Sequence, residues 1–288
     1  MNALYHYCST SAFHAIVESH AIWLSALSLS NDIMEGKVVA DTIASLAKRA
    51  SIDDRSVHEI QKALGFLEEL VEGLGFCLSE DGDLLSQWRG YAVDATGVAI
   101  GFSTEYLNKL SDSSKNQTLP GFSLARVEYD IPSQESHIKP TFDEIYKICQ
   151  SGALQGLRPD SILGKGKTEE ELMREALSFK QGINSMFARV LALLPELFRL
   201  KSLAFKEERE WRLISYFIKY GADYCEYRAI KDRIIPYRKF ELTQACGNPI
   251  VEVILGPKHT TPMKLVEKFL EQNQYRGVIV RRSKASYR

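Results

Sequence analysis

The hydrophobic positions of this chain follow two different periods, one near its ends and another in its middle. A short apolar run at 4–7 is followed by Phe13, Ile16 and Val17, and then by a second apolar run at 21–24. Spacings of three and four place the middle group on one helical face, and the serines and threonine at 9–11 offer N-caps. The chain therefore begins with a predicted strand, a short helix and a second strand.

Further apolar runs predict strands in the first half of the chain and again in its last third. The predicted strands are 75–79, 97–102, 125–129, 210–217, 224–229, 234–242, 250–255 and 278–282. Predicted helices lie at about 34–50, 57–73 and 262–272. The segment 97–102 is apolar throughout, which is typical of a strand buried on both faces.

Between about 138 and 200 the pattern changes to helical spacing without alternation. Phe179, Ile183, Met186 and Val190 recur every three or four residues, and Thr168 precedes three glutamates that favour a helix start. We therefore expect a single α+β domain over 1–288. Its split, mostly antiparallel sheet would draw strands from both ends, with a mostly helical insertion at about 138–200.

The composition is that of an ordinary globular protein. Of 288 residues, 45% are hydrophobic and 25% charged, and the net charge of −1 gives no field that attracts nucleic acid or membrane. The five cysteines are scattered, which disfavours a zinc site or a disulfide framework and favours a reducing compartment. No signal peptide and no run of about 18 apolar residues is present. We expect a cytoplasmic protein without a membrane span.

A carboxylate stands at the start of the predicted strand 210–217. Alternation gives the more polar face of this strand four residues, Glu210, Arg212, Ile214 and Tyr216. A carboxylate here could stabilise a developing positive charge or accept a hydrogen bond from a hydroxyl. An ion pair with an arginine that only fixes the strand end explains the same residue equally well.

Histidine, arginine and aromatic residues supply a second group of candidates. His6 interrupts the first strand and could donate a hydrogen bond to a ligand hydroxyl, or be a core histidine satisfied by its neighbours. Arg89 could bind a phosphate bidentately or pair with a carboxylate of the chain. The aromatics that could stack on a flat ring, or simply pack, are Tyr5, Tyr7, Trp88 and Tyr91.

The motifs of several enzyme classes are absent from the sequence. It has no P-loop, no Gly-x-Gly-x-x-Gly after a strand, no Gly-x-Ser-x-Gly elbow and no His-Glu-x-x-His. The six histidines lack metal-ligand spacing, so we expect no metal. Asn31, Asp32 and Glu35 could hold a cation, but helix capping explains them better.

Several motifs occur in one characteristic order along the chain. They are Leu4-Tyr5-His6-Tyr7, Trp23-Leu24-Ser25, the segments 85–91, 97–102, 208–212 and 254–257, and the terminal Ser286-Tyr287-Arg288. In this order they resemble the bacterial domain-of-unknown-function 2971 family over essentially the whole chain. The family name implies no activity.

The first strand, helix and strand are also similar to the start of ADP-ribosyltransferase-like folds, in particular the DNA-targeting ADP-ribosyltransferase toxins. This resemblance implies that His6 contacts ribose hydroxyls and that Glu210 completes the site. Trp88 or Tyr91 would stack on nicotinamide, with Tyr7 beside the cofactor, and Arg89 would face the pyrophosphate.

The implied function is an NAD-using enzyme, an ADP-ribosyltransferase or NAD glycohydrolase, in bacterial toxin or phage-defence systems. NAD would be a substrate, and the acceptor could be a base, a protein side chain or water. One alternative is a non-catalytic nucleotide-sensing or interaction module on the same fold. The other is a nucleic-acid-acting defence protein that sets its basic C-terminal strand, with Arg281, Arg282 and Lys284, against phosphate.

Overall fold

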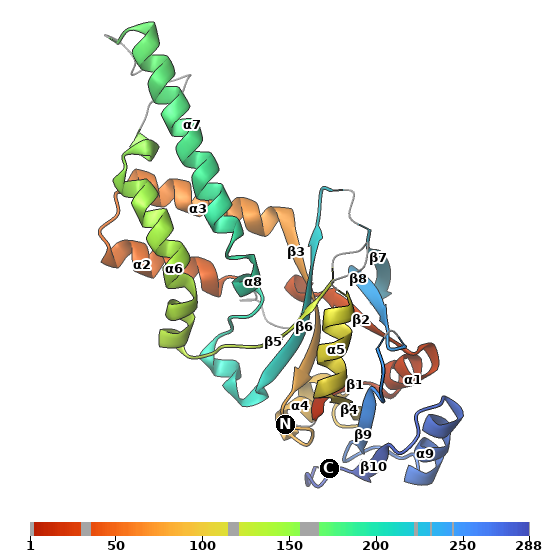
Figure 1. The fold of residues 1–288 in the computed structure, drawn as a ribbon. Coiled ribbons are helices and arrows are strands. Elements are labelled where there is room, and N and C mark those ends of the chain that lie inside the picture. The colour runs from red at the N-terminus through yellow and green to blue at the C-terminus, as the bar shows by residue number, and fades with distance from the viewer. Residues whose placement is uncertain are drawn as a thin grey trace.

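The strands of the protein form one large open sheet that lies beside a group of helices (Figure 1). The computed structural model describes residues 3–29, 36–114, 121–155, 167–221, 224–230, 232–243 and 245–287. The strands are β1 (Ala3–Cys8), β2 (Ala21–Ala26), β3 (Val71–Ser79), β4 (Val98–Ser103), β5 (Ser123–Arg126), β6 (Glu210–Ile218), β7 (Glu226–Ile230), β8 (Arg233–Glu241), β9 (Ile250–Leu255) and β10 (Ile279–Arg282). Nearly all neighbouring strands are antiparallel, and β10 runs parallel to β9.

The sheet divides at β3, which has strands on both of its edges. One edge pairs with β6 along the whole of β3, so β1 and β2 must share the other edge. There, β1 pairs through Tyr5 opposite Ser79, whereas β2 pairs through Ser25 opposite Gly75. From this fork, one branch continues through β4, β9 and β10, and the other through β8 and β7. The backbone of β3 near Cys77 therefore lies between two diverging strands.

The helices are α1 (Thr10–Ser19), α2 (Val38–Arg49), α3 (Asp54–Leu70), α4 (Leu85–Tyr91), α5 (Thr104–Ser114), α6 (Ile131–Gln150), α7 (Glu169–Leu191), α8 (Leu194–Leu197) and α9 (Met263–Gln272). The capping signals explain two of the starts. The Ser9 hydroxyl accepts from the backbone of Ala12 at the start of α1, and Thr168 forms a reciprocal capping box with Glu171 at the start of α7. The predicted helix 57–73 ends earlier, because its last three residues already belong to β3.

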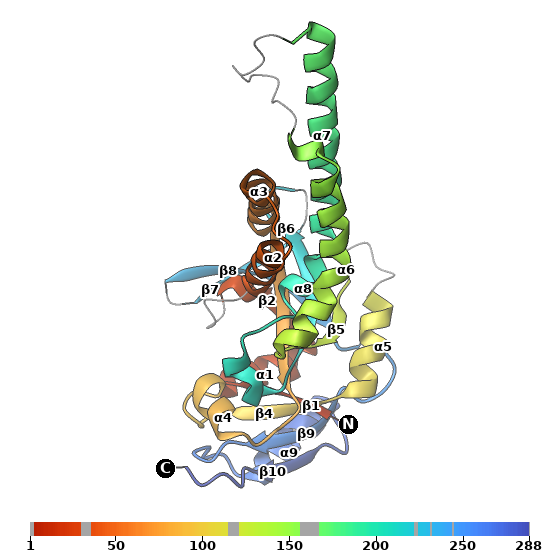
Figure 2. The same cartoon turned by 90° about the vertical axis from the view of Figure 1, so that its left-hand side faces the viewer.

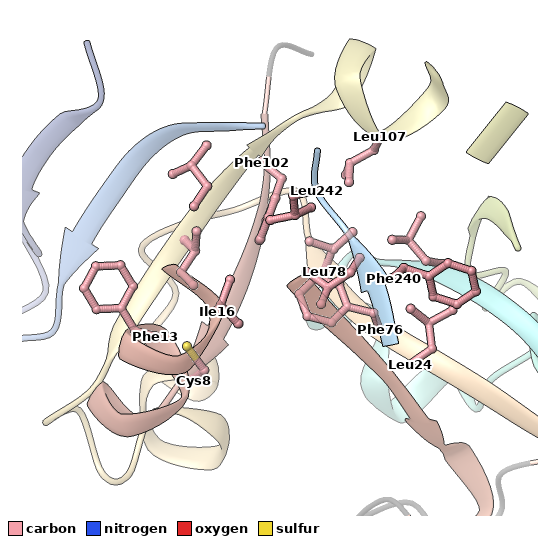
Figure 3. Packing of buried hydrophobic residues seen from close by; sticks show 14 of the residues in the cluster. Cys8, Phe13, Ile16, Leu24, Phe76, Leu78, Phe102, Leu107, Phe240 and Leu242 are labelled. Atoms are coloured by element: carbon pink, nitrogen blue, oxygen red, sulfur yellow. The ribbon is translucent and has the colours of Figure 1, made fainter. Parts of the chain in front are cut away.

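A first hydrophobic core lies between the sheet and α1, α5 and α9. Figure 3 shows side chains of α1, β3 and β4 converging with those of β8. The rings of Phe76 and Phe102 meet edge to face with centroids 5.6 Å apart. Burying each such side chain stabilises the fold by about 1.5–3 kcal/mol relative to leaving it exposed. This core fixes β1 and β3, on which the candidate residues of the first strand depend.

A second core is built by α2, α3, α6 and α7, which Figures 1 and 2 show grouped beside the sheet, with α7 extending away from it. The two cores meet across β6, where Leu213 belongs to the first and Ile214 to the second. The helices of 131–197 therefore do not pack by themselves, since α2 and α3 complete their core. The sequence analysis placed the insertion at 138–200 within the same domain, but it did not expect α2 and α3 to complete the core of these helices.

The expected class, a mixed fold with a mostly antiparallel sheet and helices, is confirmed. The single domain over 1–288 stays a prediction. None of the described helices is both long and apolar enough to cross a lipid bilayer.

Candidate functional site

One pocket opens where β1 and β6 flank the end of β3, and it contains the two residues that the sequence analysis ranked first. His6 of β1 and Glu210 of β6 both line it. The strand registers explain this meeting, because Ser79 of β3 lies opposite Tyr5 on one edge and opposite Glu210 on the other. The pocket holds about 560 Å³ of empty space, its open mouth included. It is called the first pocket below, and its walls are Tyr5, His6, Tyr7, Leu27, Cys77, Leu78, Gln87, Tyr91, Lys201, Glu208, Glu210 and Arg212.

His6 is held as a neutral hydrogen-bond acceptor. Its Nδ1 lies 2.8 Å from the carbonyl oxygen of Cys77. Because a carbonyl only accepts, Nδ1 must carry the hydrogen, and Nε2 of the neutral ring is left with a lone pair. Burial lowers the pKa of His6 to about 4 against the opposing effect of the Cys77 carbonyl, and the charge of Arg228 lowers it further. The sequence analysis expected a donor here, but this tautomer makes His6 an acceptor for a ligand hydroxyl.

Glu210 lies at the centre of a buried ion-pair network. Its Oε1 accepts from Arg212 Nε at 2.6 Å, and its Oε2 accepts from Arg212 Nη2 at 3.0 Å. Oε2 also accepts from the Lys201 ammonium at 2.9 Å. Burial alone would raise the pKa of Glu210, but the two cations outweigh it and bring the pKa to about 2. Glu210 is therefore a carboxylate at every physiological pH, and both its oxygens have cationic partners.

Lys201 joins Glu210 to a second carboxylate at the pocket. Its ammonium donates to Glu208 Oε2 at 2.7 Å, and the Tyr91 hydroxyl donates to Glu208 Oε1 at 3.1 Å. Burial would lower the pKa of Lys201, but Glu210 and Glu208 raise it overall. The ammonium also lies 4.6 Å from the ring centre of Phe205. Two carboxylates and two cations thus face each other with no net formal charge.

The other predicted site residues are divided by the structure. Tyr7 and Tyr91 line the first pocket. The Tyr7 hydroxyl is already engaged, because it donates to the Asp81 carbonyl at 2.8 Å. Trp88 is fully buried and donates from Nε1 to Asp83, and Arg89 lies over the Tyr287 ring at 5.8 Å. Neither Trp88 nor Arg89 belongs to the pocket wall, because α4 turns them toward other parts of the chain.

Three residues near the site were not among the sequence candidates, namely Lys201, Glu208 and Arg228. Lys201 and Glu208 line the first pocket, and Arg228 lies close enough to His6 to lower the pKa of the histidine. Glu208 carried a usable signal, since it stands two residues before Glu210 at the entry to β6. Lys201 carried none, because it follows α8 in an irregular segment whose path depends on tertiary packing.

The basic C-terminal strand finds partners within the chain. Arg281 Nε donates to Glu252 at 2.7 Å, and Arg282 Nη1 donates to the His259 carbonyl at 2.8 Å. Within the described ranges, no group of three or more histidine, cysteine, aspartate or glutamate side chains could hold a metal ion. Asn31, Asp32 and Glu35 lie outside the described residues.

Comparison with known proteins finds a family model over part of the chain and no activity. Residues 87–213 match the model of a family described as "Protein of unknown function (DUF2971)". This match confirms the resemblance over these residues, which include Tyr91, Lys201, Glu208, Glu210 and Arg212 of the first pocket. No curated protein and no solved structure matched the chain.

Proposed function

We propose that this protein is an NAD-using enzyme of the ADP-ribosyltransferase or NAD glycohydrolase type, with its site in the first pocket and no metal. The observation that carries the proposal is the shared pocket of a neutral acceptor, His6, and a permanently ionised carboxylate, Glu210. The two come from strands that are far apart in sequence. The toxin or phage-defence setting rests on the family resemblances given above.

The chemistry of the pocket supports glycosidic cleavage of a nucleoside. Breaking the bond between ribose and nicotinamide develops positive, oxocarbenium-like charge on the sugar. A fixed carboxylate stabilises that charge more in the transition state than in the ground state. In the proposed complex, His6 Nε2 accepts from a ribose hydroxyl, and Glu210 faces the sugar. The acceptor of the ADP-ribosyl group is a base, a protein side chain or water.

Lys201 has a specific part in this proposal. Arg212 holds Glu210 by two donors, so that pair fixes the carboxylate in place. Lys201 is a flexible point charge that already bonds Glu208 as well as Glu210. A substrate hydroxyl that replaces the ammonium at Oε2 would leave Lys201 paired with Glu208. Glu210 would then be free to act on the ribose without breaking the Arg212 pair.

A non-catalytic nucleotide-sensing or interaction module is the second candidate. The observation that favours it is the complete pairing of Glu210 with Arg212 and Lys201. If Lys201 keeps its position when a nucleotide binds, both oxygens of Glu210 stay paired with cations. Glu210 would then stabilise the positive charge of the transition state only weakly, and cleavage would be slow. Such a pocket would bind a nucleotide through His6 and release it unchanged.

Incubation of the purified protein with NAD, followed by chromatographic detection of nicotinamide, separates the two candidates. The informative variant is His6→Asn, because the asparagine amide can still donate to the Cys77 carbonyl while the Nε2 acceptor is lost. The matched control is His14→Asn, since His14 is exposed on α1, where it faces Glu18 and the ring of Phe269 and lies in neither pocket wall.

The enzyme proposal expects nicotinamide release by the unmodified chain and by His14→Asn, with at least a roughly tenfold loss in His6→Asn. Binding of NAD without any nicotinamide release would replace the enzyme with the sensing module. Equal release by both variants would remove the first pocket from the reaction.

A further inference from the structure

A second pocket adjoins the first one at the fork of the sheet. It holds about 930 Å³ of empty space, its mouth included, and shares His6, Cys77 and Tyr91 with the first pocket. Its other walls come from α1, β2 and β3, and Arg228 of β7 completes it. The two pockets therefore adjoin at these three residues, and together they are called the cleft below.

Arg228 is a cation with no ion-pair partner among the residues that the structure describes. Its Nη2 donates to the Ser25 hydroxyl at 2.9 Å, and its guanidinium carbon lies 5.5 Å from the ring centre of Trp23. Its Nε is buried and has no hydrogen-bond partner in the part of the chain that the structure describes. A guanidinium has five N–H donors, and at least the one on Nε is available to a ligand here. Across β3, Arg212 by contrast has Glu210 as its bidentate partner.

The electrostatics of the second pocket favour an anion. Its wall contains no aspartate or glutamate among the described residues. Burial lowers the pKa of Arg228, which shows that the cation loses solvation without full compensation. Its charge also reaches His6, whose pKa it lowers. A half-buried guanidinium in an apolar wall gains most from a ligand that brings negative charge and two neighbouring acceptor oxygens. A phosphate group offers both, because two of its oxygens match the parallel N–H donors of the guanidinium.

We propose that Arg228 binds a phosphate group in the second pocket, and that the ligand of the whole cleft is a nucleotide whose diphosphate lies at Arg228 while its sugar reaches His6. The inference rests on the proposed function for the sugar end of the ligand, but the phosphate site stands on Arg228 alone. It assigns to Arg228 the role that the sequence analysis gave to Arg89, which lies outside both pocket walls.

The test is calorimetric binding of ADP, adenosine and inorganic pyrophosphate to the full chain. The variants are Arg228→Gln, which removes the charge, and Arg228→Lys, which keeps the charge without the planar fork. The matched control is Arg233→Gln, since Arg233 lies on the neighbouring strand β8, is half exposed and faces Asp232. Thermal melts of each variant establish that the chain is folded before titration.

The unmodified chain is expected to bind ADP more tightly than adenosine, and Arg228→Gln to lose roughly 10- to 100-fold in ADP affinity with little change for adenosine. The ADP affinity of Arg228→Lys should lie between those of the unmodified chain and Arg228→Gln. The ADP affinity of Arg233→Gln should equal that of the unmodified chain. Equal affinity for ADP and adenosine, no binding of ADP or pyrophosphate, or an equal loss in Arg233→Gln would overturn the inference. If Arg228 governs ADP binding but NAD is not cleaved, the phosphate site stands and the enzyme proposal fails.

Discussion

His6 donates from Nδ1 to the carbonyl oxygen of Cys77 across 2.8 Å, at the point where β1 and β2 part from the same edge of β3. A fork in a sheet leaves backbone groups of the central strand without a strand partner, and buried backbone carbonyls need one. The side chain of His6 satisfies this carbonyl. In doing so it fixes its own tautomer and leaves Nε2 as an acceptor on a residue that lines both pockets.

The burial of His6 makes stability depend on pH in a definite direction, because it disfavours the charged ring more than the Cys77 carbonyl favours it. The pKa of His6 is about 4 in the folded chain, below the ordinary value of 6.5. Between pH 6.5 and pH 4 the histidine is protonated in the unfolded chain but neutral in the folded chain. The free energy of unfolding therefore falls as pH falls through this window. At pH 5 the loss amounts to about 2 kcal/mol.

Urea denaturation at pH 7 and pH 5, for the unmodified chain and for His6→Asn, measures this effect. The unmodified chain should lose about 2 kcal/mol more between the two pH values than the variant does. Parallel losses in the two proteins would show that His6 titrates normally and is open to water.

The ion pair of Glu210 and Arg212 should be strongly coupled. Each of the single changes Glu210→Gln and Arg212→Gln removes one member of a buried ion pair, which typically costs about 3–5 kcal/mol, although Glu210 keeps Lys201 when Arg212 is replaced. The double variant removes both charges and should lose clearly less than the sum of the two. Because the pKa of Glu210 is about 2, below its ordinary 4.5, this stabilisation is complete above about pH 4.5 and is lost progressively as pH falls from there toward 2.

Urea denaturation of the four proteins gives the coupling energy. Glu105→Gln serves as the control, because Glu105 forms an exposed pair with Lys109 on α5 and should change stability little. Additive losses in the double variant would mean that Glu210 and Arg212 do not depend on each other.

Part of the site could be predicted from the sequence because a polar residue in an apolar strand is a local signal. His6 and Glu210 interrupt such strands, and alternation alone placed Glu210 and Arg212 on one face. Trp88 gave a misleading signal, since an aromatic beside an arginine suits a binding loop as well as a helix. In the structure α4 buries Trp88 against Tyr7, with ring centres 4.9 Å apart.

Other features depend on contacts between distant segments, which local patterns do not carry. The predicted helix 57–73 ran past Leu70 because its apolar residues continue directly into β3. The helix Thr104–Ser114 was not expected at all, although Tyr106 and Leu107 pack into the first core. Arg228 could not be recognised as a pocket residue from the sequence, because only the fork of the sheet brings β7 near His6 of β1.

The second core packs against β3 where the ring of Phe198 lies over Gly73, so adding a methyl group at Gly73 should disturb it. A Cβ at Gly73 would lie 2.5 Å from the ring of Phe198, closer than packed carbons allow. Gly73→Ala should therefore cost about 1–3 kcal/mol, because the ring must move within a filled core. Gly65 on α3 is the matched control, since nothing lies within 4 Å of its added Cβ. Gly65→Ala should be neutral or stabilise by up to about 1 kcal/mol. Thermal melts compare the two, and equal effects would contradict this packing.

The role of Glu210 in turnover needs a measurement that is independent of its role in stability. Glu210→Gln should lower the melting temperature whether or not the residue is catalytic, because Arg212 and Lys201 lose their shared anion. Activity must therefore be expressed per folded molecule, at a temperature where the variant is fully folded. The glutamine keeps the size and one acceptor but not the charge, so the loss falls on the transition state. We expect nicotinamide release per folded molecule to fall by about 10²–10³-fold, with NAD affinity nearly unchanged. A destabilised variant that keeps its turnover would make Glu210 a structural anion and leave the reaction without its proposed carboxylate.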